Sequence, residues 1–297
     1  MRTIKGSDLS IFFRKLYDLM FEADLFSRAA QSAFYLAFSI FPFLLFLTSL
    51  FGLVLDSSDG IKNELILYLR QVMPATASEL VSSTLAEIAV NSSSGKLTIG
   101  LLITLWSASS GVNALRAALN AVYQLAERRS WLLLRIHSLG LTLALCILSA
   151  IVLAIVFYGW QFAGLASQYF GMPITSPYFL VVIQWVSILV LMLLVCELIY
   201  NLLPDHITFE WEWVTSGSIV AIVLWLVLTG LFRLYLHYFN SYDRTYGSLG
   251  AVIILLLWLY LTALTVMIGG AINTVLRQMR DEHRKNVGLP PDQTVCH

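Results

Sequence analysis

Long apolar stretches alternate with short polar segments along the whole chain. About 20 apolar residues are enough for a helix to cross the hydrocarbon core of a bilayer. Helices are favoured there because lipid offers no hydrogen-bond partner to the backbone. The longest stretch without Asp, Glu, Lys or Arg, 136–196, contains Pro173 and Pro177 and therefore accommodates two helices with a turn between them. The pattern predicts six transmembrane helices, at about 29–55, 97–120, 137–163, 178–203, 213–237 and 249–276.

The six spans make up a membrane domain of residues 29–276, and the segments before, between and after the spans have patterns of their own. Residues 1–28 are predicted to be a cytoplasmic N-terminal segment with an amphipathic helix, which lies either in the headgroup plane or against the cytoplasmic face of the bundle. Residues 56–96 are predicted to be an exterior loop with two short helices, and 277–297 a basic cytoplasmic tail. The apolar side of the N-terminal helix consists of Leu9, Phe12, Phe13, Leu16 and Met20.

The distribution of Lys and Arg predicts the orientation of the spans. Thirteen of the 18 basic residues lie before the first predicted span, from Arg116 at the end of the second span to the start of the third, or after the sixth. Cytoplasmic loops of membrane proteins carry an excess of Lys and Arg. An even number of spans with both termini in the cytoplasm agrees with this bias.

The composition supports the membrane interpretation and weakens others. Apolar residues make up 58% of the chain and charged residues 12%, whereas soluble domains have about 45–50% and about 25%. We therefore predict an all-α integral membrane protein. The net charge is zero, so no basic field indicates a nucleic-acid partner.

Two ionisable residues are predicted near the cytoplasmic ends of spans. Arg116 and Glu197 each follow 19 residues that carry no Asp, Glu, Lys or Arg. Charges at membrane depth are costly, so each needs a partner or access to the headgroups. One hypothesis is that Arg116 and Glu197 form an ion pair across the bundle. The alternative is that each side chain extends separately to the interface.

Polar residues recur at three- to four-residue spacing on the first, second, fourth and sixth predicted spans. Such faces are expected to point into the bundle, where they hold helices together by hydrogen bonds. The alternative is that they line a polar cavity or a path for lipid. The candidate residues are Tyr35, Ser39, Pro42, Trp106, Ser109, Asn113, Arg116, Asn120, Gln184, Glu197, Asn201, Thr262, Thr265 and Asn273.

A second group of polar and aromatic residues is predicted at the outer boundary of the membrane. Aromatic and Arg side chains are common at the interface between bilayer and water. These residues form either such a belt or a rim that binds lipid headgroups. They are Arg233, Tyr242, Asp243, Arg244 and Tyr246.

The sequence contains no motif for catalysis or cofactor binding. None of the five histidines has a His, Asp or Cys at the spacing of a metal site. No Gly-rich phosphate loop or nucleophile elbow is present. We therefore predict no catalytic residue, no metal and no cofactor.

Short motifs are spread over nearly the whole chain, namely AFYLAFSIFP at 33–42, WSASSG at 106–111, LNAVY at 119–123, YNLLP at 200–204, YGSLGA at 246–251, WLY at 258–260 and GAIN at 270–273. Together they resemble the YihY/BrkB family of bacterial inner-membrane proteins. The match at 246–251 is the most specific, whereas Ile272 stands where family members commonly carry an acidic residue.

This resemblance implies a six-span protein of the bacterial inner membrane that serves envelope integrity, with transport of lipid or lipopolysaccharide as its expected role. Its expected partners are membrane lipids. A different expectation is a scaffold that anchors an envelope protein through loop 56–96 or the basic tail. The family has also been labelled a ribonuclease that acts on tRNA. The missing metal motif and the neutral net charge argue against that label.

Overall fold

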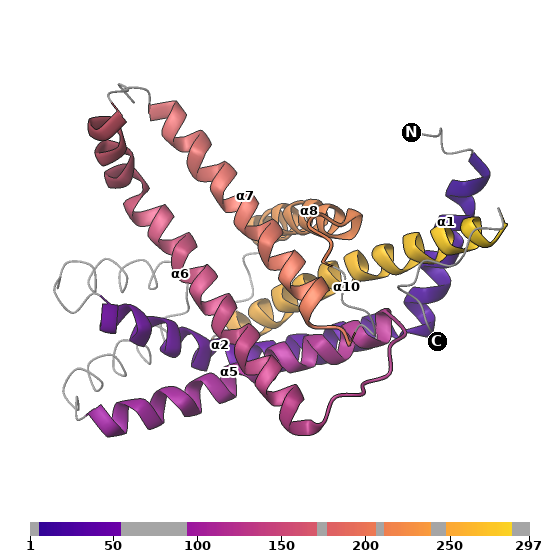
Figure 1. Cartoon of the computed structure of the whole chain (residues 1–297), viewed down its shortest axis with the longest axis horizontal. Coiled ribbons are helices and arrows are strands. Elements are labelled where there is room, and N and C mark those ends of the chain that lie inside the picture. The colour runs from indigo at the N-terminus through magenta and orange to yellow at the C-terminus, as the bar shows by residue number, and fades with distance from the viewer. Residues whose placement is uncertain (1–5, 55–93, 171–176, 206–210, 239–247, 287–297) are drawn as a thin grey trace.

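The computed structural model describes residues 6–54, 94–170, 177–205, 211–238 and 248–286. This part of the chain is all-helical and contains no strand, so the predicted all-α class is confirmed. The helices are α1 (Gly6–Glu22), α2 (Leu25–Val54), α5 (Ser94–Val122), α6 (Trp131–Phe170), α7 (Pro177–Leu202), α8 (Ser216–Tyr238) and α10 (Ser248–Asn286) (Figure 1).

Each of the six apolar stretches predicted to span the membrane falls on one of these helices. Within the described residues, four helices are long and apolar enough to cross a bilayer, namely α6, α7, α8 and α10. Almost all of the predicted exterior loop 56–96 lies outside the described residues. Its last three residues already belong to α5.

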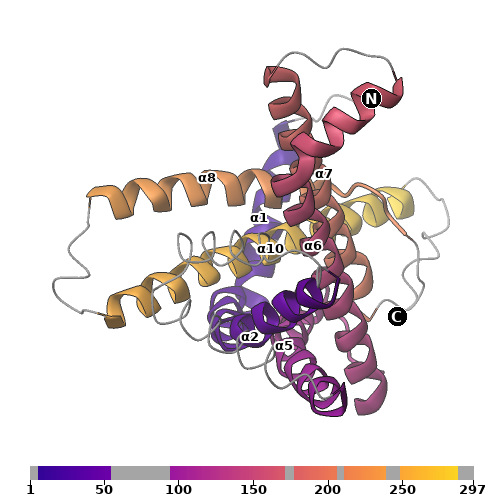
Figure 2. The same cartoon turned by 90° about the vertical axis from the view of Figure 1, so that its left-hand side faces the viewer.

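Neighbouring helices pack in pairs that share one end. The principal pairs are α2 with α5, α8 with α10, α2 with α10, α5 with α6 and α6 with α7. Figures 1 and 2 show α2 and α5, and likewise α8 and α10, close together at one end and further apart at the other. We call the shared end the polar end. It carries residues 123–130, 203–205 and 211–215.

Two clusters of buried apolar side chains hold the polar end together. The first joins α1, α2, α5 and α10 around Leu25, Val122 and Met267, which are completely buried. The second joins α5, α6, α7 and α8 around Leu119 and Tyr200. Because α5 contributes to both clusters, it connects the α2–α10 side of the bundle with the α6–α7 side.

A bend at Asp24 turns the chain from α1 into α2. Asp24 has a φ of 48°, in the left-handed region that Asp tolerates better than most residues. Its amide donates to the carbonyl of Phe21 at 3.1 Å, and the Nε of Arg28 donates to the carbonyl of Ala23 at 2.9 Å. These contacts end α1 and make α1 run across the polar end instead of along the bundle (Figures 1 and 2).

Candidate functional site

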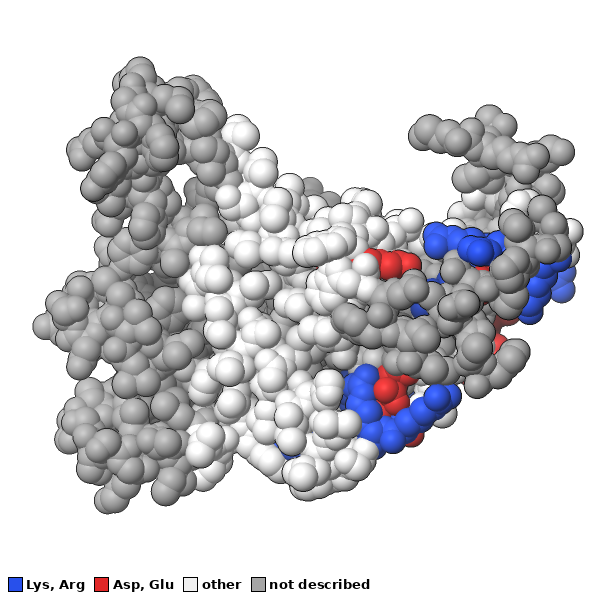
Figure 3. Space-filling view, viewed as in Figure 1, with Lys and Arg blue, Asp and Glu red and all other residues white. Residues whose placement is uncertain are grey.

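Charged side chains gather at the polar end of the molecule. On the face shown in Figure 3, Lys, Arg, Asp and Glu lie near α1 and the polar-end loops, and the central surface is almost free of charge. Two hydrogen-bonded groups of buried or half-buried residues occupy this end. We call them the Arg129 network and the Glu197 network.

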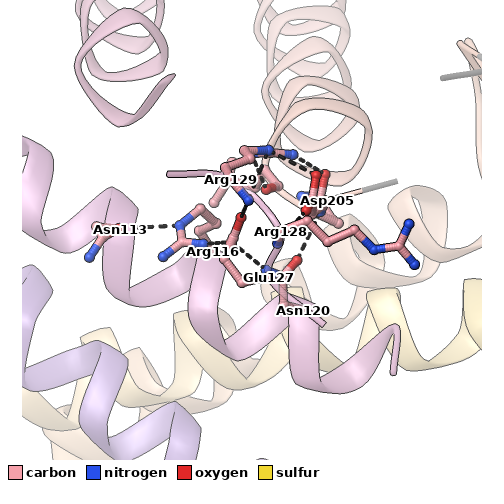
Figure 4. Close-up of polar contacts among 9 residues, drawn as sticks. Asn113, Arg116, Asn120, Glu127, Arg128, Arg129 and Asp205 are labelled. Carbon is pink, nitrogen blue, oxygen red and sulfur yellow. Dashed lines mark hydrogen bonds and ion pairs between the residues drawn. The ribbon is translucent and has the colours of Figure 1, made fainter. Parts of the chain in front are cut away.

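The Arg129 network joins the end of α5, the loop after it and the end of α7 (Figure 4). The Nε of Arg129 donates to Asp205 Oδ1 at 3.0 Å, and its Nη2 donates to the carbonyl of Pro204 at 2.8 Å. The Oδ1 of Asn120 accepts from the backbone amide of Asp205 at 2.9 Å. Arg129 therefore fixes the position of the α7 terminus against the end of α5.

Glu127 connects this network to Arg116. The guanidinium of Arg116 forms an ion pair with Glu127, and its Nε donates to Asn113 Oδ1 at 3.2 Å. The Nδ2 of Asn120 donates to Glu127 Oε2 at 2.9 Å. The hypothesis that Arg116 pairs with Glu197 is therefore wrong. Glu127 follows Arg116 by only 11 positions, and the bend after α5 brings its carboxylate within reach of the Arg116 guanidinium.

Replacing Arg129 by alanine is expected to destabilise the protein by about 2–3 kcal/mol. The change leaves the largely buried Asp205 carboxylate and the carbonyl of Pro204 without the side chain that binds them. The measurement is chemical unfolding of the purified protein in detergent.

Arg128→Ala is the matched control for Arg129→Ala. It removes the same charge from the neighbouring position, but only the backbone amide of Arg128 contacts Asp205, at 2.8 Å. Figure 4 shows its side chain directed away from the other residues drawn. Equal stability of the two variants would contradict the role assigned to Arg129.

The Glu197 network surrounds a carboxylate that is only 1% exposed. Glu197 Oε1 accepts hydrogen bonds from the backbone amide of Thr215 at 2.9 Å and from Ser218 Oγ at 2.5 Å. Glu197 Oε2 accepts from Asn201 Nδ2 at 3.3 Å. From α10, Asn273 Oδ1 accepts from the amide of Gly217 at 2.7 Å.

These contacts cap the N-terminus of α8. The first amides of a helix lack partners within it, and this end of the helix dipole favours negative charge. Here the amide of Thr215 donates to Glu197, and the amide of Gly217 donates to Asn273. The amide of Ser218 donates to the Oγ1 of Thr215. The buried Glu197 carboxylate is thus balanced by hydrogen-bond donors and by the helix terminus, and α7, α8 and α10 are held together at this point.

Several other candidate residues bond within their own helix. Ser39, Ser109 and Thr265 donate to carbonyls three residues earlier, and Thr262 donates to one four residues earlier. Thr262 also accepts from the indole of Trp225 at 3.2 Å. Such side chains add little polarity to a surface, because their hydroxyls are already satisfied. This bonding favours helix packing over a polar path at these positions.

Trp106 and Tyr35 differ from the expectation that they face the interior. Their exposed fractions are 45% and 42%. The guanidinium of Arg135 lies over the Trp106 ring, 3.8 Å from its centre, and Trp131 packs beside it. Aromatic rings with a polar edge are favoured at membrane boundaries, where exposure of this kind is common.

The remaining predicted residues have separate positions. Pro42 is half-buried inside α2, and Arg233 is exposed on α8. The backbone of Gln184 belongs to α7. The other predicted rim residues lie outside the described residues, namely Tyr242, Asp243, Arg244 and Tyr246.

Sequence reasoning missed five residues of the two networks. Glu127, Arg129 and Asp205 lie in loops, where a charge is normally solvated. Thr215 and Ser218 lie at the start of the apolar stretch that forms α8. Thr followed by small polar residues is a signal of a helix N-cap. That signal identifies the cap, but it does not reveal that Glu197 and Asn273 from other helices complete it.

In the described part of the chain, both networks consist of hydrogen bonds and ion pairs between protein groups. No group of three His, Cys, Asp or Glu side chains in it is arranged to hold a metal ion. The donors and acceptors of both networks bind other protein groups. The arrangement therefore positions helices at the polar end.

Sequence comparisons give the chain close relatives among bacterial proteins. The model of the family described as Virulence factor BrkB matches residues 16–293. The chain is 31% identical to the ribonuclease-like protein YfkH of Bacillus subtilis (strain 168), over 91% of this chain and 94% of that protein. It is 25% identical to a UPF0761 membrane protein of Laribacter hongkongensis (strain HLHK9), over 70% of this chain and 47% of that protein. No solved structure matches it significantly.

Proposed function

This chain belongs to the BrkB family of membrane proteins, and from that premise we propose its arrangement and role in the cell. It is a multi-pass protein of the bacterial inner membrane that crosses the bilayer six times, with both termini in the cytoplasm. It assists the transport of lipid or lipopolysaccharide in the cell envelope. It does so through noncovalent contacts with lipids and without catalysing a reaction.

The six-span arrangement is supported by the helix pairs. Four helices already meet the requirements of a span, α2 contains residues 29–54 of the uncharged stretch 29–55, and α5 contains the uncharged stretch 97–115. The loops at the polar end carry Arg128 and Arg129, and α1 and the basic end of α10 lie at the same end. The excess of Lys and Arg on the cytoplasmic side of membrane proteins supports a cytoplasmic position for this end.

The divergence of the helices away from the polar end is the observation that carries the lipid-transport proposal. Helix α8 contacts α10 and α7, yet only 11% of its apolar segment Ser216–Leu236 is buried. Exposed side chains on this helix include Val223, Val227 and Leu231. A closed bundle would cover more of them. Apolar surfaces that diverge from a fixed end can contact the acyl chains of a lipid while the polar end stays closed.

A lipid redistribution assay tests the proposal. The full chain is reconstituted into vesicles with a fluorescent phospholipid, and the accessibility of the fluorophore to a membrane-impermeant quencher is followed in time. We expect faster exchange of the lipid between leaflets than in protein-free vesicles or in vesicles that hold an unrelated six-span protein.

Two outcomes would argue against this function. An exchange rate equal to that of the controls would leave the protein without the proposed activity. Cleavage of tRNA by the same purified protein would favour the ribonuclease activity suggested by the name of the Bacillus subtilis relative.

A further inference from the structure

The outer side of α1 carries an exposed aromatic row. Phe13, Tyr17 and Phe21 follow one another at four-residue spacing, and their exposed fractions are 59%, 62% and 58%. The rings of Tyr17 and Phe21 lie 4.6 Å apart between centres. Water alone is an unfavourable environment for so much contiguous apolar surface.

The inner side of α1 already has its partner within the protein. Leu19 is buried in the first core cluster, and Phe12, Leu16 and Met20 pack against it. Lys15 adds an ion pair with Glu282 of α10, at 2.5 Å. The aromatic row is therefore a second apolar face, separate from the one that attaches α1 to the bundle.

The row continues onto α2 beyond the bend. Phe21 contacts Phe26 with 6.1 Å between ring centres, and further along α2 Phe34 and Phe38 are exposed and 4.8 Å apart. Helix α1 runs across the polar end, whereas α2 runs away from it (Figures 1 and 2). The same exposed face thus passes from the end of the bundle along the side of a proposed span.

We propose that the aromatic row of α1 lies in the interfacial layer of the bilayer that α2 crosses. Lipid covers the outside of α2 at Phe34 and Phe38, and the continuity of the row extends that cover to Phe26 and α1. Aromatic side chains are favoured at this depth because their rings tolerate both acyl chains and headgroups. A protein partner on α1 would cover only part of this continuous face, because lipid already covers the part on α2.

The polar residues beside the row define the kind of lipid surface. Arg14, Asp18 and Glu22 form a neighbouring exposed row with one positive and two negative charges. Lys15 is already paired with Glu282. Attraction to anionic headgroups therefore does not hold α1 in place, and burial of the aromatic rings does. Neutral and anionic bilayers are expected to bind α1 equally well.

The test measures the surroundings of single positions in the full chain, reconstituted into vesicles. Spin labels are placed on single cysteines, with Cys146, Cys196 and Cys296 replaced by serine. The variants are Phe13→Cys and Phe21→Cys in the row and Arg14→Cys and Asp18→Cys as matched controls on the same helix. Phe34→Cys serves as a reference on α2. Collisions with oxygen, which concentrates in lipid, are compared with collisions with a water-soluble nickel complex.

We expect labels at 13 and 21 to collide more with oxygen than with the nickel complex, and labels at 14 and 18 to show the reverse. The pattern is expected to be the same in phosphatidylcholine vesicles with and without phosphatidylglycerol. Water-like behaviour at 13 and 21 would overturn the inference. So would immobile labels that neither reagent reaches, because these would indicate a protein partner.

This inference depends on the proposed six-span arrangement but not on lipid transport. A label at 34 that contacts water would show that α2 does not cross the membrane there, and the span assignment itself would fail. A lipid-exposed label at 34 together with water-exposed labels at 13 and 21 would remove only the placement of α1. A negative lipid redistribution assay would leave this placement intact.

Discussion

Replacing Glu197 by alanine is expected to cause the largest loss of stability of any single polar substitution at the polar end, about 3–5 kcal/mol. The change leaves the amide of Thr215 without its acceptor and takes the shortest hydrogen bond from the hydroxyl of Ser218, which keeps only the carbonyl of Thr215. The Nδ2 of Asn201 loses the carboxylate but keeps the backbone carbonyls of Glu197 and Glu212. These donors are buried, so water does not replace the carboxylate. The N-terminus of α8 then loses its attachment to α7. Unfolding in detergent and the yield of folded protein measure the effect.

Glu212→Ala is the matched control for Glu197→Ala. It also removes one carboxylate, but the side chain of Glu212 is 46% exposed and lies 3.8 Å from Arg277. Exposed ion pairs contribute about 0–1 kcal/mol, so this variant is expected to remain nearly as stable as the wild type. Glu197→Gln retains one acceptor oxygen and is expected to fall between the two. A Glu197→Ala protein as stable as Glu212→Ala would show that the cap is not important.

Replacing Gly269 by alanine is expected to force α8 and α10 apart. A Cβ on Gly269 would lie 2.6 Å from the carbonyl oxygen of Gly217 and 2.8 Å from the Cβ of Ala221. It would also meet the hydroxyl of Tyr200, which donates to the carbonyl of Val266 at 2.8 Å. Two of these three neighbours are fixed to a helix backbone and cannot rotate away. We expect a loss of about 1–3 kcal/mol from overpacking, with further loss as Asn273 moves away from the α8 terminus.

Gly230→Ala is the control for this substitution. It makes the same chemical change on α8, but a Cβ there meets no atom within 4 Å. Since alanine has a higher helix propensity than glycine, this variant is expected to be neutral or slightly more stable. Thermal unfolding of both proteins distinguishes the outcomes. Equal melting temperatures would mean that the close approach of α8 and α10 is not required.

The helix positions were accessible from the sequence because the solvent imposes a simple rule. A chain segment in lipid must satisfy its backbone within itself, so each predicted span falls on a helix. The predicted segment 178–203, for example, lies on α7 at Pro177–Leu202. The prediction was less accurate where helices extend into the polar region. Helix α10 continues past 276 to Asn286 because the basic residues there form a helical turn as readily as apolar ones do.

The candidate site was predictable in its residue types but not in its pairings. Polar residues on apolar helices had to find partners, and Asn120, Glu197, Asn201 and Asn273 do so. Depth alone suggested that Arg116 faces Glu197. Their actual partners come from the loop at Glu127 and from the N-terminus of α8. Loop conformation and helix termini depend on the packing of the whole bundle, which periodicity does not describe.

By itself, the sequence determined that this is a helical membrane protein, where its helices run and which polar residues need partners. These properties follow from the free energy of transfer from water to lipid, which each segment carries independently of the others. Only the tertiary structure decided which partners meet. The cap on α8, the contact of α8 with α10 at Gly217 and Gly269, and the second apolar face of α1 arise between segments distant in the chain. Such contacts are set by distance and direction in space.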